Sequence, residues 1–452
     1  MTTFHSVIVI GAGISGLTCA YALKKRGVDV LLLETSNSLG GLIRSVEQDG
    51  YLFETGPQSF STTAQLNALI EELGIASELV TAPPKAPRYV LINGKLRPVP
   101  LGPGAFLASS LLSWSTKFSI LRDPFGKSFP PEDDESIAAF VRRKFTAQLL
   151  DRLVGPFVSG IYAGDPEKIS FRAAFPSLYE AEKAAGSLVR GMKAAAKKHT
   201  GPRVKPTLAS FQRGNQTLVN ALAEKLGDAL RAGVRVEQIS RSSDNQFTVS
   251  AAAEQFQCEH LVIATPTATA SALLRSLAPS AADALSQIEY APVAVVSLAY
   301  RRTDIEHSLD GFGFLVPREA GLKILGTVWS SSLFANRAPN DHVQVTSFLG
   351  GATDPDTASL SASSLVELAH RELAPVLGLK AQPAVSRVTA YERAIPQYNL
   401  GHTARLVTIS ADLAKIPGLH LTGNYLKGPA IGSCVEHAQE VAESIRVGRK
   451  SV

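Results

Sequence analysis

The residues of this chain with the clearest chemical potential lie between positions 7 and 57, where glycines and an acid recur at set spacings. The glycine-rich run comprises Gly11, Ala12, Gly13, Ile14, Ser15 and Gly16, and Glu34 follows it. In such a run Gly11 permits a tight turn, Gly13 lets backbone N–H groups approach a pyrophosphate, and Gly16 allows close packing of a helix. A carboxylate at Glu34 can accept hydrogen bonds from ribose hydroxyls. These residues therefore predict a dinucleotide site.

Two strands and a helix must hold these residues in place. A β-branched run, Val7–Ile10, leads into the first glycine, and a second apolar run, Val30–Leu33, ends at Glu34. A helical pattern lies between them, so its N-terminus would turn free N–H groups and a positive dipole end toward phosphates. The order of strand, glycines, helix, strand and acid indicates a βαβ nucleotide-binding unit. The alternative is a glycine-rich turn in an unrelated α/β domain.

A second glycine pair indicates which dinucleotide to expect. Thr35 follows Glu34, and the next loop and strand contribute Gly40, Gly41, Leu42, Ile43, Arg44 and Gly56. An NAD enzyme does not need a glycine pair here, whereas FAD is longer and its pyrophosphate and ribityl chain run past this loop. The G-G-x-x-R-S pattern and the later Phe53–Pro57 segment resemble FAD proteins of the amine oxidase superfamily.

A segment near the C-terminus fits the same cofactor. His420–Asn424 predicts a strand that ends in a turn, and Gly428–Ala438 predicts the start of a helix. The residues concerned are Gly423, Asn424, Pro429, Ala430 and Ile431. In the superfamily that the chain resembles, this helix N-terminus points at the flavin ring and can stabilise negative charge on it. FAD is therefore the predicted cofactor.

Composition sets broad limits on the protein. Its 452 residues are 45% hydrophobic and 19% charged, enough for two or three domains with a large core. The net charge of +5 suits an acidic substrate or an anionic membrane surface and is no nucleic-acid signature by itself. Cys19, Cys258 and Cys434 lie far apart, so neither disulfides nor a metal site are expected. With no signal-peptide pattern and no apolar run approaching 18 residues, a cytoplasmic protein is expected.

Strand and helix patterns predict an α/β protein of three domains. A Rossmann-like (GR2-type) FAD domain takes residues 1–85, 206–270 and 396–452, and an α+β mixed-sheet substrate domain takes 86–100 and 271–395. Residues 101–205 form a helical domain with a basic run from Arg190 to Lys205, which is either a solvated helix face or a contact with anionic lipid headgroups. Strands are predicted at Arg88–Pro100 (a hairpin around Asn93-Gly94), Val234–Ile239, Phe247–Ser250, Leu261–Pro266, Val293–Tyr300, Gly311–Pro317, Lys323–Val328 and Val343–Gly350.

Several segments are similar to one group within the amine oxidase superfamily. Gly155–Pro176 resembles a block of protoporphyrinogen oxidases, as do Gly41–Ser45, Phe348–Gly351 and Ile395–His402. The resemblance covers about residues 5 to 445 and is to the oxygen-dependent, FAD-containing porphyrinogen oxidases, which act on protoporphyrinogen IX or coproporphyrinogen III. It implies three two-electron oxidations of a porphyrinogen in haem biosynthesis, each passing a hydride to flavin, with O2 as acceptor and H2O2 as product.

The same resemblance implies a substrate site. Arg88 would pair with a propionate, although a surface arginine is the alternative. Leu315, Val328 and Phe348 would sandwich the macrocycle, although such residues also fill ordinary sheet cores. Gly160 would bring a backbone carbonyl near a methylene bridge of the substrate, or else break a helix.

The resemblance also implies two further cofactor contacts, and it assigns no chemical role to the histidines. Ile239 would place its main chain against the adenine, and Arg44 would lie near the flavin. No residue is predicted to be a general base, and His402 and His437 are interpreted as structural. Catalysis is therefore expected to depend on orientation and on the electrophilicity of the flavin.

Three alternatives remain open. Protoporphyrinogen IX is the favoured substrate, and coproporphyrinogen III, with two more propionates, needs additional cations that the sequence does not place. An amine oxidase or carotenoid desaturase would share the FAD frame, but Gly155–Pro176 and Ile395–His402 argue against both. A non-catalytic flavin protein that passes porphyrin to a chelatase is the third class. The predicted partners are a porphyrinogen and O2, and no nucleic acid is expected. The resemblance implies contact with the cytoplasmic face of a membrane and a second copy of the chain. A chelatase that receives the product is a further predicted partner.

Overall fold

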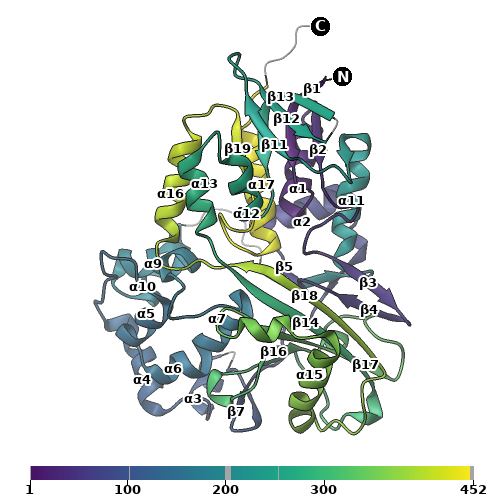
Figure 1. Cartoon of the computed structure of the whole chain (residues 1–452). Helices are drawn as coiled ribbons and strands as arrows, with labels where there is room; N and C mark the ends of the chain where they lie inside the picture. Colours follow the sequence, from purple (N-terminus) through teal and green to yellow (C-terminus); the bar gives the residue numbers. More distant parts are fainter. Residues whose placement is uncertain (1, 101, 199–204, 253, 448–452) are drawn as a thin grey trace.

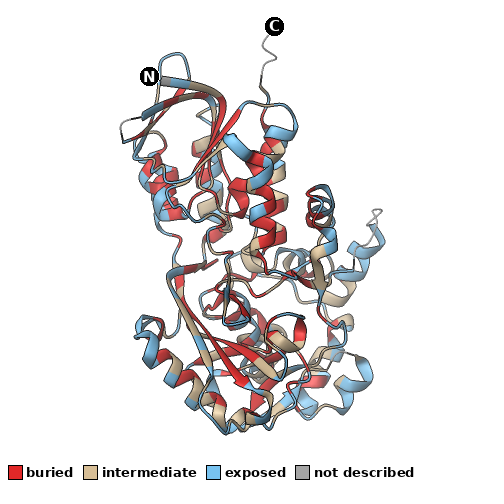
Figure 2. Cartoon of the chain, turned by 90° about the vertical axis from the view of Figure 1, so that its right-hand side faces the viewer, coloured by how far each residue is buried: buried red, intermediate tan, exposed pale blue. Residues whose placement is uncertain are grey.

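Two large sheets and a group of helices make up the computed structural model, which describes residues 2–100, 102–198, 205–252 and 254–447. In Figure 1 one sheet and its helices form the upper part, the second sheet forms the lower part, and the helical region lies at the lower left. Figure 2 shows buried positions along the strands of both sheets and exposed positions on the outer faces of the surrounding helices. The predicted α/β class is confirmed, while the domain boundaries stay a prediction.

The first sheet has the order β10-β2-β1-β13-β12-β11, and β19 also pairs with β13. Its strands are β1 (Thr2–Ile10), β2 (Val30–Leu33), β10 (Leu230–Arg231), β11 (Gln238–Arg241), β12 (Phe247–Ala251), β13 (Glu254–Ile263) and β19 (Leu419–Leu421). Ile10 pairs in register with Leu33 and with Ile263, so the carboxyl ends of the central parallel strands meet at one edge. Loops that follow these strands converge at that edge.

One predicted strand of this sheet was wrong in its extent. The strand expected at Val234–Ile239 begins only at Gln238. The Val234 N–H donates to the Glu34 carbonyl at 2.8 Å, so the chain runs past the end of β2 before it joins β12. The two-residue strand β10 takes the edge beside β2 instead.

Helices cover both faces of the first sheet because successive strand residues point to opposite sides. Val7 and Val9 pack against α1 (Ile14–Lys25), α2 (Ala64–Glu72), α11 (Gln216–Leu226) and α17 (Ile431–Ser444). Ile8 and Ile10 pack against α12 (Thr267–Leu274), α13 (Pro279–Ser286) and α16 (His402–Leu413). Two small sheets flank this unit: β3 (Ser45–Gln48) with β4 (Tyr51–Glu54), and β5 (Phe60–Ser61), β9 (Leu208–Phe211) and β6 (Leu79–Thr81).

The second sheet has the order β18-β14-β17-β16-β15-β7-β8. Its strands are β7 (Arg88–Ile92), β8 (Lys95–Pro98), β14 (Tyr290–Arg301), β15 (Gly313–Leu315), β16 (Ile324–Val328), β17 (His342–Gly350) and β18 (Val385–Pro396). The predicted hairpin is confirmed, with positive φ at Asn93 and Gly94 as its two-residue turn requires. The strand predicted at Gly311–Pro317 is shorter, because the ladder with β7 begins only at Gly313. Helix α15 (Ala362–Leu377) covers one face of this sheet.

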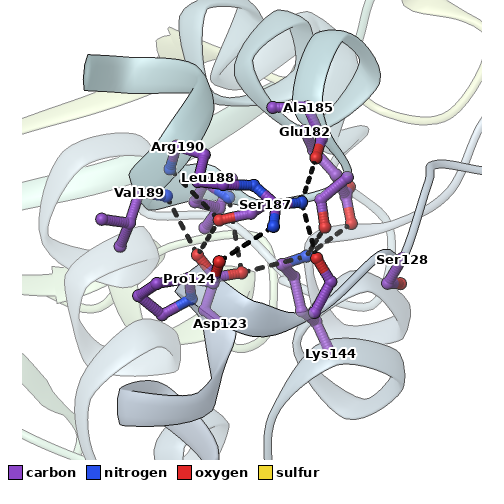
Figure 3. Close-up of polar contacts among 12 residues, drawn as sticks. Asp123, Pro124, Ser128, Lys144, Glu182, Ala185, Ser187, Leu188, Val189 and Arg190 are labelled. Carbon is purple, nitrogen blue, oxygen red and sulfur yellow. Dashed lines mark hydrogen bonds and ion pairs between the residues drawn. The ribbon is translucent and has the colours of Figure 1, made fainter. Parts of the chain in front are cut away.

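The helical region contains a hydrophobic core and a group of buried charges, and Figure 3 shows the charges. Its helices are α3 (Pro103–Ala108), α4 (Trp114–Arg122), α5 (Ile137–Lys144), α6 (Ala147–Leu149), α7 (Gly155–Tyr162), α8 (Phe171–Ala174), α9 (Pro176–Ala185) and α10 (Leu188–Lys198). Lys144 lies 3.1 Å from Asp123 and 3.2 Å from Glu182, and all three side chains are buried. No helix in the described ranges is long and apolar enough to cross a membrane. Arg203, part of the predicted basic run, lies outside the described residues.

Candidate active site

The glycine-rich loop after β1 has the shape that its sequence predicts. Gly11 has a φ of +103°, and a β-carbon there would lie 2.9 Å from the Ala264 carbonyl oxygen. A β-carbon at Gly16 would lie 1.8 Å from the carbonyl oxygen of Gly11, so only glycine lets α1 begin so close to the strand. At Gly13, by contrast, no described atom would lie within 4 Å of a β-carbon. The loop therefore packs tightly on two sides and is open at Gly13.

Glu34 is fixed beside this loop at the end of β2. Its carboxylate accepts hydrogen bonds from the Ala12 N–H at 2.6 Å and from the Ser36 N–H at 2.8 Å. These bonds use part of the accepting capacity of the two oxygens and leave lone pairs for hydroxyl donors. Thr35 is exposed next to it.

The second glycine loop lies against the first, although the sequence separates them by more than twenty residues. The Gly40 N–H donates to the Ala12 carbonyl at 2.9 Å, and a β-carbon on Gly41 would lie 3.5 Å from the Gly13 Cα. A β-carbon on Gly56 would lie 2.0 Å from the Leu42 carbonyl oxygen. The segment around Gly56 therefore supports the loop that contains Leu42, Ile43 and Arg44.

The C-terminal segment reaches the same place through α17. Ile431 and Cys434 at the start of α17 share a buried cluster with Ile14 and Leu17 of α1. The N-cap residue of α17, Ala430, offers no side-chain hydrogen bond, and neither does Gly13 at the start of α1. Two helices therefore begin in the same region with N–H groups that side chains do not cap.

A buried aromatic pair holds the turn that precedes α17. The Tyr398 hydroxyl donates to the Asn424 carbonyl at 2.7 Å, and His402 Nε2 lies 3.1 Å from the Tyr425 carbonyl. The two rings stack with centroids 4.2 Å apart. Burial lowers the pKa of His402 to about 4, so the imidazole is neutral near pH 7 and can donate from Nε2. These contacts agree with a structural role for His402. His437 Nδ1 lies 3.2 Å from the Thr422 hydroxyl, which agrees with a structural role for His437.

These features fit FAD. The open side of Gly13, the uncapped starts of α1 and α17, and the Glu34 carboxylate provide the donors and acceptors that phosphates, a flavin and a ribose need. The Arg44 side chain is exposed beside them. The Ile239 side chain is buried in a cluster that contains Phe247 and Val249 and also Ile10 and Leu33, which precede Gly11 and Glu34. Only its main chain is left to meet an adenine.

The residues predicted to bind substrate share one face of the second sheet. Gly313 pairs with both Arg88 and Val328, while Gly326 pairs with both Leu315 and Phe348. Because paired residues lie on the same side of a sheet and the side alternates along each strand, Arg88, Leu315, Val328 and Phe348 all point away from α15. Register thus brings together four residues that come from four strands.

Helix α7 lies over this face. A β-carbon on Gly160 would lie 2.7 Å from Leu315 Cδ2, so the helix approaches the sheet at its glycine. The Ala352 N–H and the Gln397 side chain donate to the Ala163 and Tyr162 carbonyls at 2.7 and 2.8 Å, which fixes the end of α7. Gly160 lies inside this helix and does not break it.

Arg88 is an exposed cation at the rim of that face. Its guanidinium lies 5.3 Å from the centroid of the Phe312 ring, a cation–π distance. No carboxylate of the described residues forms an ion pair with it. Arg97 of β8 lies on the same face because it pairs with Val90, and it is also exposed.

Contacts that the sequence did not predict link this face to the glycine loops. The Thr55 hydroxyl lies 3.1 Å from the Tyr391 hydroxyl of β18, and the Ser330 hydroxyl donates to the Gln58 side chain at 3.4 Å. Glu54 lies 3.6 Å from Arg337, which follows α14 (Ser330–Leu333). The Phe53–Pro57 motif indicated the segment that contains Glu54. Arg337 is a single arginine in a loop and belongs to no sequence pattern that would have predicted this contact. No cluster of three metal-binding side chains occurs in the described part of the chain.

Comparison with known proteins identifies the class. A family model described as flavin containing amine oxidoreductase matches residues 14–446. A crystal structure from Exiguobacterium sp. 255-15 matches with a TM-score of 0.81 at 26% identity, covering 98% of each chain. Cyclohexylamine oxidase from Brevibacterium oxydans IH-35A matches with a TM-score of 0.72 at 19% identity, covering 97% and 98%, which shows the fold alone. The chain belongs to the flavin-containing amine oxidoreductases, and it is an oxidoreductase that uses FAD.

Curated relatives narrow the group within that class. The chloroplastic protoporphyrinogen oxidase of Nicotiana tabacum is 38% identical over 467 residues, covering 97% of this chain and 85% of the relative. The coproporphyrinogen III oxidase of Bacillus subtilis is 28% identical over 461 residues, covering 96% of both. The chain is thus a member of the protoporphyrinogen and coproporphyrinogen oxidase family, as its sequence motifs predicted.

Proposed function

We propose that this protein oxidises protoporphyrinogen IX to protoporphyrin IX in haem biosynthesis. Bound FAD would supply a two-electron acceptor for each of three oxidations, in each of which the macrocycle would lose a hydride and a proton, and O2 would finally take up two electrons and two protons as H2O2. The residues of the chain bind and orient the macrocycle, and none of them is assigned as a proton acceptor. Orientation then supplies the contribution of the protein to the rate.

The observation that carries this proposal is the shared face of Arg88, Leu315, Val328 and Phe348. Three apolar side chains offer a flat surface to a large apolar disc, and a guanidinium at the rim suits a propionate. The Thr55–Tyr391 contact joins this face to the segment that supports the second glycine loop. A disc on this face would therefore lie toward the cofactor site.

The number of cations favours protoporphyrinogen over coproporphyrinogen. Among the side chains that β7, β8, β15 and β16 place on this face around the pairs described above, the exposed cations are Arg88, Arg97 and Lys95, which pairs with Ile92. Two guanidiniums match the two propionates of protoporphyrinogen. Coproporphyrinogen carries four propionates, and its two additional carboxylates would need Lys95 and a further partner or solvent.

Parallel turnover measurements test the proposal. Purified FAD-loaded protein would receive protoporphyrinogen IX or coproporphyrinogen III in air, with porphyrin fluorescence and H2O2 followed together. A higher kcat/KM for protoporphyrinogen IX supports the proposal, whereas a higher value for coproporphyrinogen III transfers the assignment to that substrate. Oxidation of neither substrate with the flavin intact overturns the porphyrinogen assignment and directs attention to amines and polyenes.

We also propose that the helical region makes peripheral contact with a membrane. Large hydrophobic side chains are exposed there: Leu107, Trp114, Phe118, Leu121, Phe125, Phe129, Phe157, Ile161 and Met192. Phe125 is 85% exposed, and the cations Arg122 and Lys127 lie near it in the chain. Exposed aromatic side chains with neighbouring cations suit the interface of an anionic bilayer.

Arg190 and the buried Asp123 bind the loop that carries Phe125, the most exposed of these hydrophobic side chains (Figure 3). The Arg190 guanidinium donates to the Pro124 and Gly126 carbonyls at 2.9 and 2.8 Å. Asp123 accepts bonds from the Ser187 hydroxyl and the Val189 N–H, each at 2.9 Å. Phe125 is thus presented on a rigid loop, so little conformational entropy would be lost on docking. A homodimer, which the resemblance implies, and handover of the product to a chelatase both stay predictions.

A further inference from the structure

We infer that Arg337 is a positioning residue, which through Glu54 holds the second glycine loop and the substrate face at a fixed distance from each other. The reasoning starts from where Arg337 lies. It belongs to the connection between α14 and β17 of the second sheet, and its side chain crosses to the unit that contains the first sheet. Its role in turnover rests on the proposed function, while its effect on FAD binding does not.

Arg337 is one of the largest fully buried side chains, with 1% of its surface exposed. Its guanidinium donates to the Ser210 hydroxyl at 2.6 Å and to the Phe211 carbonyl at 3.3 Å, both in β9. The Phe334 ring centroid lies 5.4 Å from its Cζ atom. A charged group this deeply buried is costly unless bonds and an opposite charge compensate it. The buried Arg337 guanidinium therefore needs an oppositely charged partner.

Glu54, when ionised, provides that opposite charge at 3.6 Å, and 2% of its side chain is exposed. It also accepts bonds from the Ser45 hydroxyl at 2.7 Å and the Asn215 N–H at 2.8 Å. A β-carbon on Gly214 would lie 2.9 Å from a Glu54 oxygen, so glycine is needed at that point. The carboxylate thus joins the strand pair β3–β4, the start of α11 and the second sheet at one place.

Residues that follow Glu54 in the chain contact the second glycine loop directly. The Thr55 N–H donates to the Arg44 carbonyl at 2.9 Å, and Gly56 packs directly on the Leu42 carbonyl. The Leu52 N–H donates to the carbonyl of Arg337 itself at 3.2 Å. Loss of the Arg337 side chain would remove the cation beside Glu54, and the contacts of Thr55 and Gly56 would transmit the resulting shift to the second glycine loop.

Variants of this pair separate positioning from mere stability. Arg337→Met leaves the Glu54 carboxylate buried without its cation, and Glu54→Gln with Arg337→Met removes both charges. We expect Arg337→Met to lower the unfolding midpoint and the double variant to recover most of that loss. Arg213→Gln is the control, since Arg213 and Glu78 form a more exposed ion pair beside the same strand.

The decisive readouts are FAD affinity and turnover per bound flavin. We expect the dissociation constant of FAD to rise about tenfold in Arg337→Met and to remain raised in the stable double variant, with kcat per flavin lowered and KM little changed. Arg337→Lys should restore part of the FAD affinity, because it keeps the charge but loses the forked geometry.

Other outcomes have definite meanings. If FAD affinity and kcat per flavin in the double variant equal those of the unmodified protein, Arg337 is only structural and the inference fails. If the unmodified protein oxidises neither porphyrinogen, the proposed function fails, and the FAD affinities alone still decide whether the ion pair positions the loop.

Discussion

Gly160 of α7 and Leu315 of β15 approach so closely that a β-carbon on the glycine would lie 2.7 Å from Leu315 Cδ2. At this point Leu315 of the sheet fills the space that a side chain on α7 would otherwise occupy. Because the obstructing atom is the end of a flexible side chain, Leu315 can turn away if Gly160 becomes larger. The two residues thereby set the width of the gap between α7 and the proposed substrate face.

Gly160→Ala should impair substrate binding more than stability. Alanine favours the helix by about 1 kcal/mol relative to glycine, which offsets part of the strain from moving Leu315. We expect the KM for the porphyrinogen to rise several-fold while the unfolding midpoint changes little, as measured by steady-state kinetics and thermal unfolding. Gly104→Ala in α3 is the control, since no described atom lies within 4 Å of a β-carbon there. An unchanged KM would remove Gly160 from the substrate site.

The glycines of the first loop should respond differently to the same substitution. Gly13 has extended backbone angles (φ −69°, ψ 173°) and free space beside it, so Gly13→Ala should leave the apoprotein stable. We expect its FAD dissociation constant to rise at least about tenfold, because the methyl group would occupy the path of the pyrophosphate.

Gly16→Ala should instead disturb folding, since its β-carbon would lie 1.8 Å from a backbone oxygen. We expect the free energy of unfolding to fall by about 2 kcal/mol or more, as measured by urea denaturation without FAD. Equal destabilisation by both variants would contradict the assignment of the open side of the loop to the cofactor.

Arg88 and Arg97 should contribute to substrate affinity through their charges. Loss of a charge-assisted hydrogen bond costs about 1.5–3 kcal/mol, so Arg88→Gln should lower kcat/KM roughly 10- to 100-fold. The loss should appear in KM, since a propionate lies at the rim and not at the bonds that react. Arg97→Gln should have a smaller effect in the same direction. Arg231→Gln, in the exposed pair with Glu254 of the first sheet, is the control.

The pH dependence of stability should reveal Glu54. Burial raises its pKa from 4.5 to about 7, and Arg337, Ser45 and the Asn215 N–H only partly oppose this shift. The folded protein therefore binds this proton more tightly than the unfolded chain does. The stabilisation from the bound proton is complete below pH 4.5 and is lost as the pH rises through 7.

Glu54→Gln should accordingly remove part of the decline in stability over that pH range. Urea unfolding of both proteins at several pH values measures the difference, and all other titrating groups cancel in the comparison. Arg337 is the charged group that faces Glu54 in the described chain, so it enters both measurements equally. Parallel pH profiles would show that Glu54 stays ionised throughout.

Sequence reasoning succeeded where local chemistry dictates local structure. Gly11 has a positive φ, Gly16 lies against the Gly11 carbonyl within the same loop, and Asn93-Gly94 fits its turn, so the residue types predict the local shape. Sequence reasoning was less accurate where hydrogen bonds to a distant segment decide whether residues join a strand. Val234 looks like a strand residue, but its N–H bonds to the end of β2 and the ladder starts four residues later.

The contacts of Arg337, which join the second sheet to the unit that contains the first sheet, could not be predicted for the same reason. Nothing near Arg337 in the sequence indicates that its side chain would be buried, because its partners Ser210, Phe211 and Glu54 are more than a hundred residues away. The common face of Arg88, Leu315, Val328 and Phe348 likewise depends on the strand register. A resemblance could name these four residues, but register alone explains why they point the same way.

Phe125 should anchor the protein on anionic bilayers. Burial of one phenylalanine side chain is worth about 1.5–3 kcal/mol, so Phe125→Ser should weaken vesicle binding about tenfold or more. Cosedimentation with vesicles of phosphatidylglycerol and phosphatidylcholine measures this, and added salt should reduce the binding through the cations Arg122 and Lys127. Val407→Ser, which changes an exposed residue of α16, is the matched control and should bind normally. Equal binding by the two variants would show that this loop does not contact the bilayer, because Phe125 has too little buried surface for its loss to act through folding.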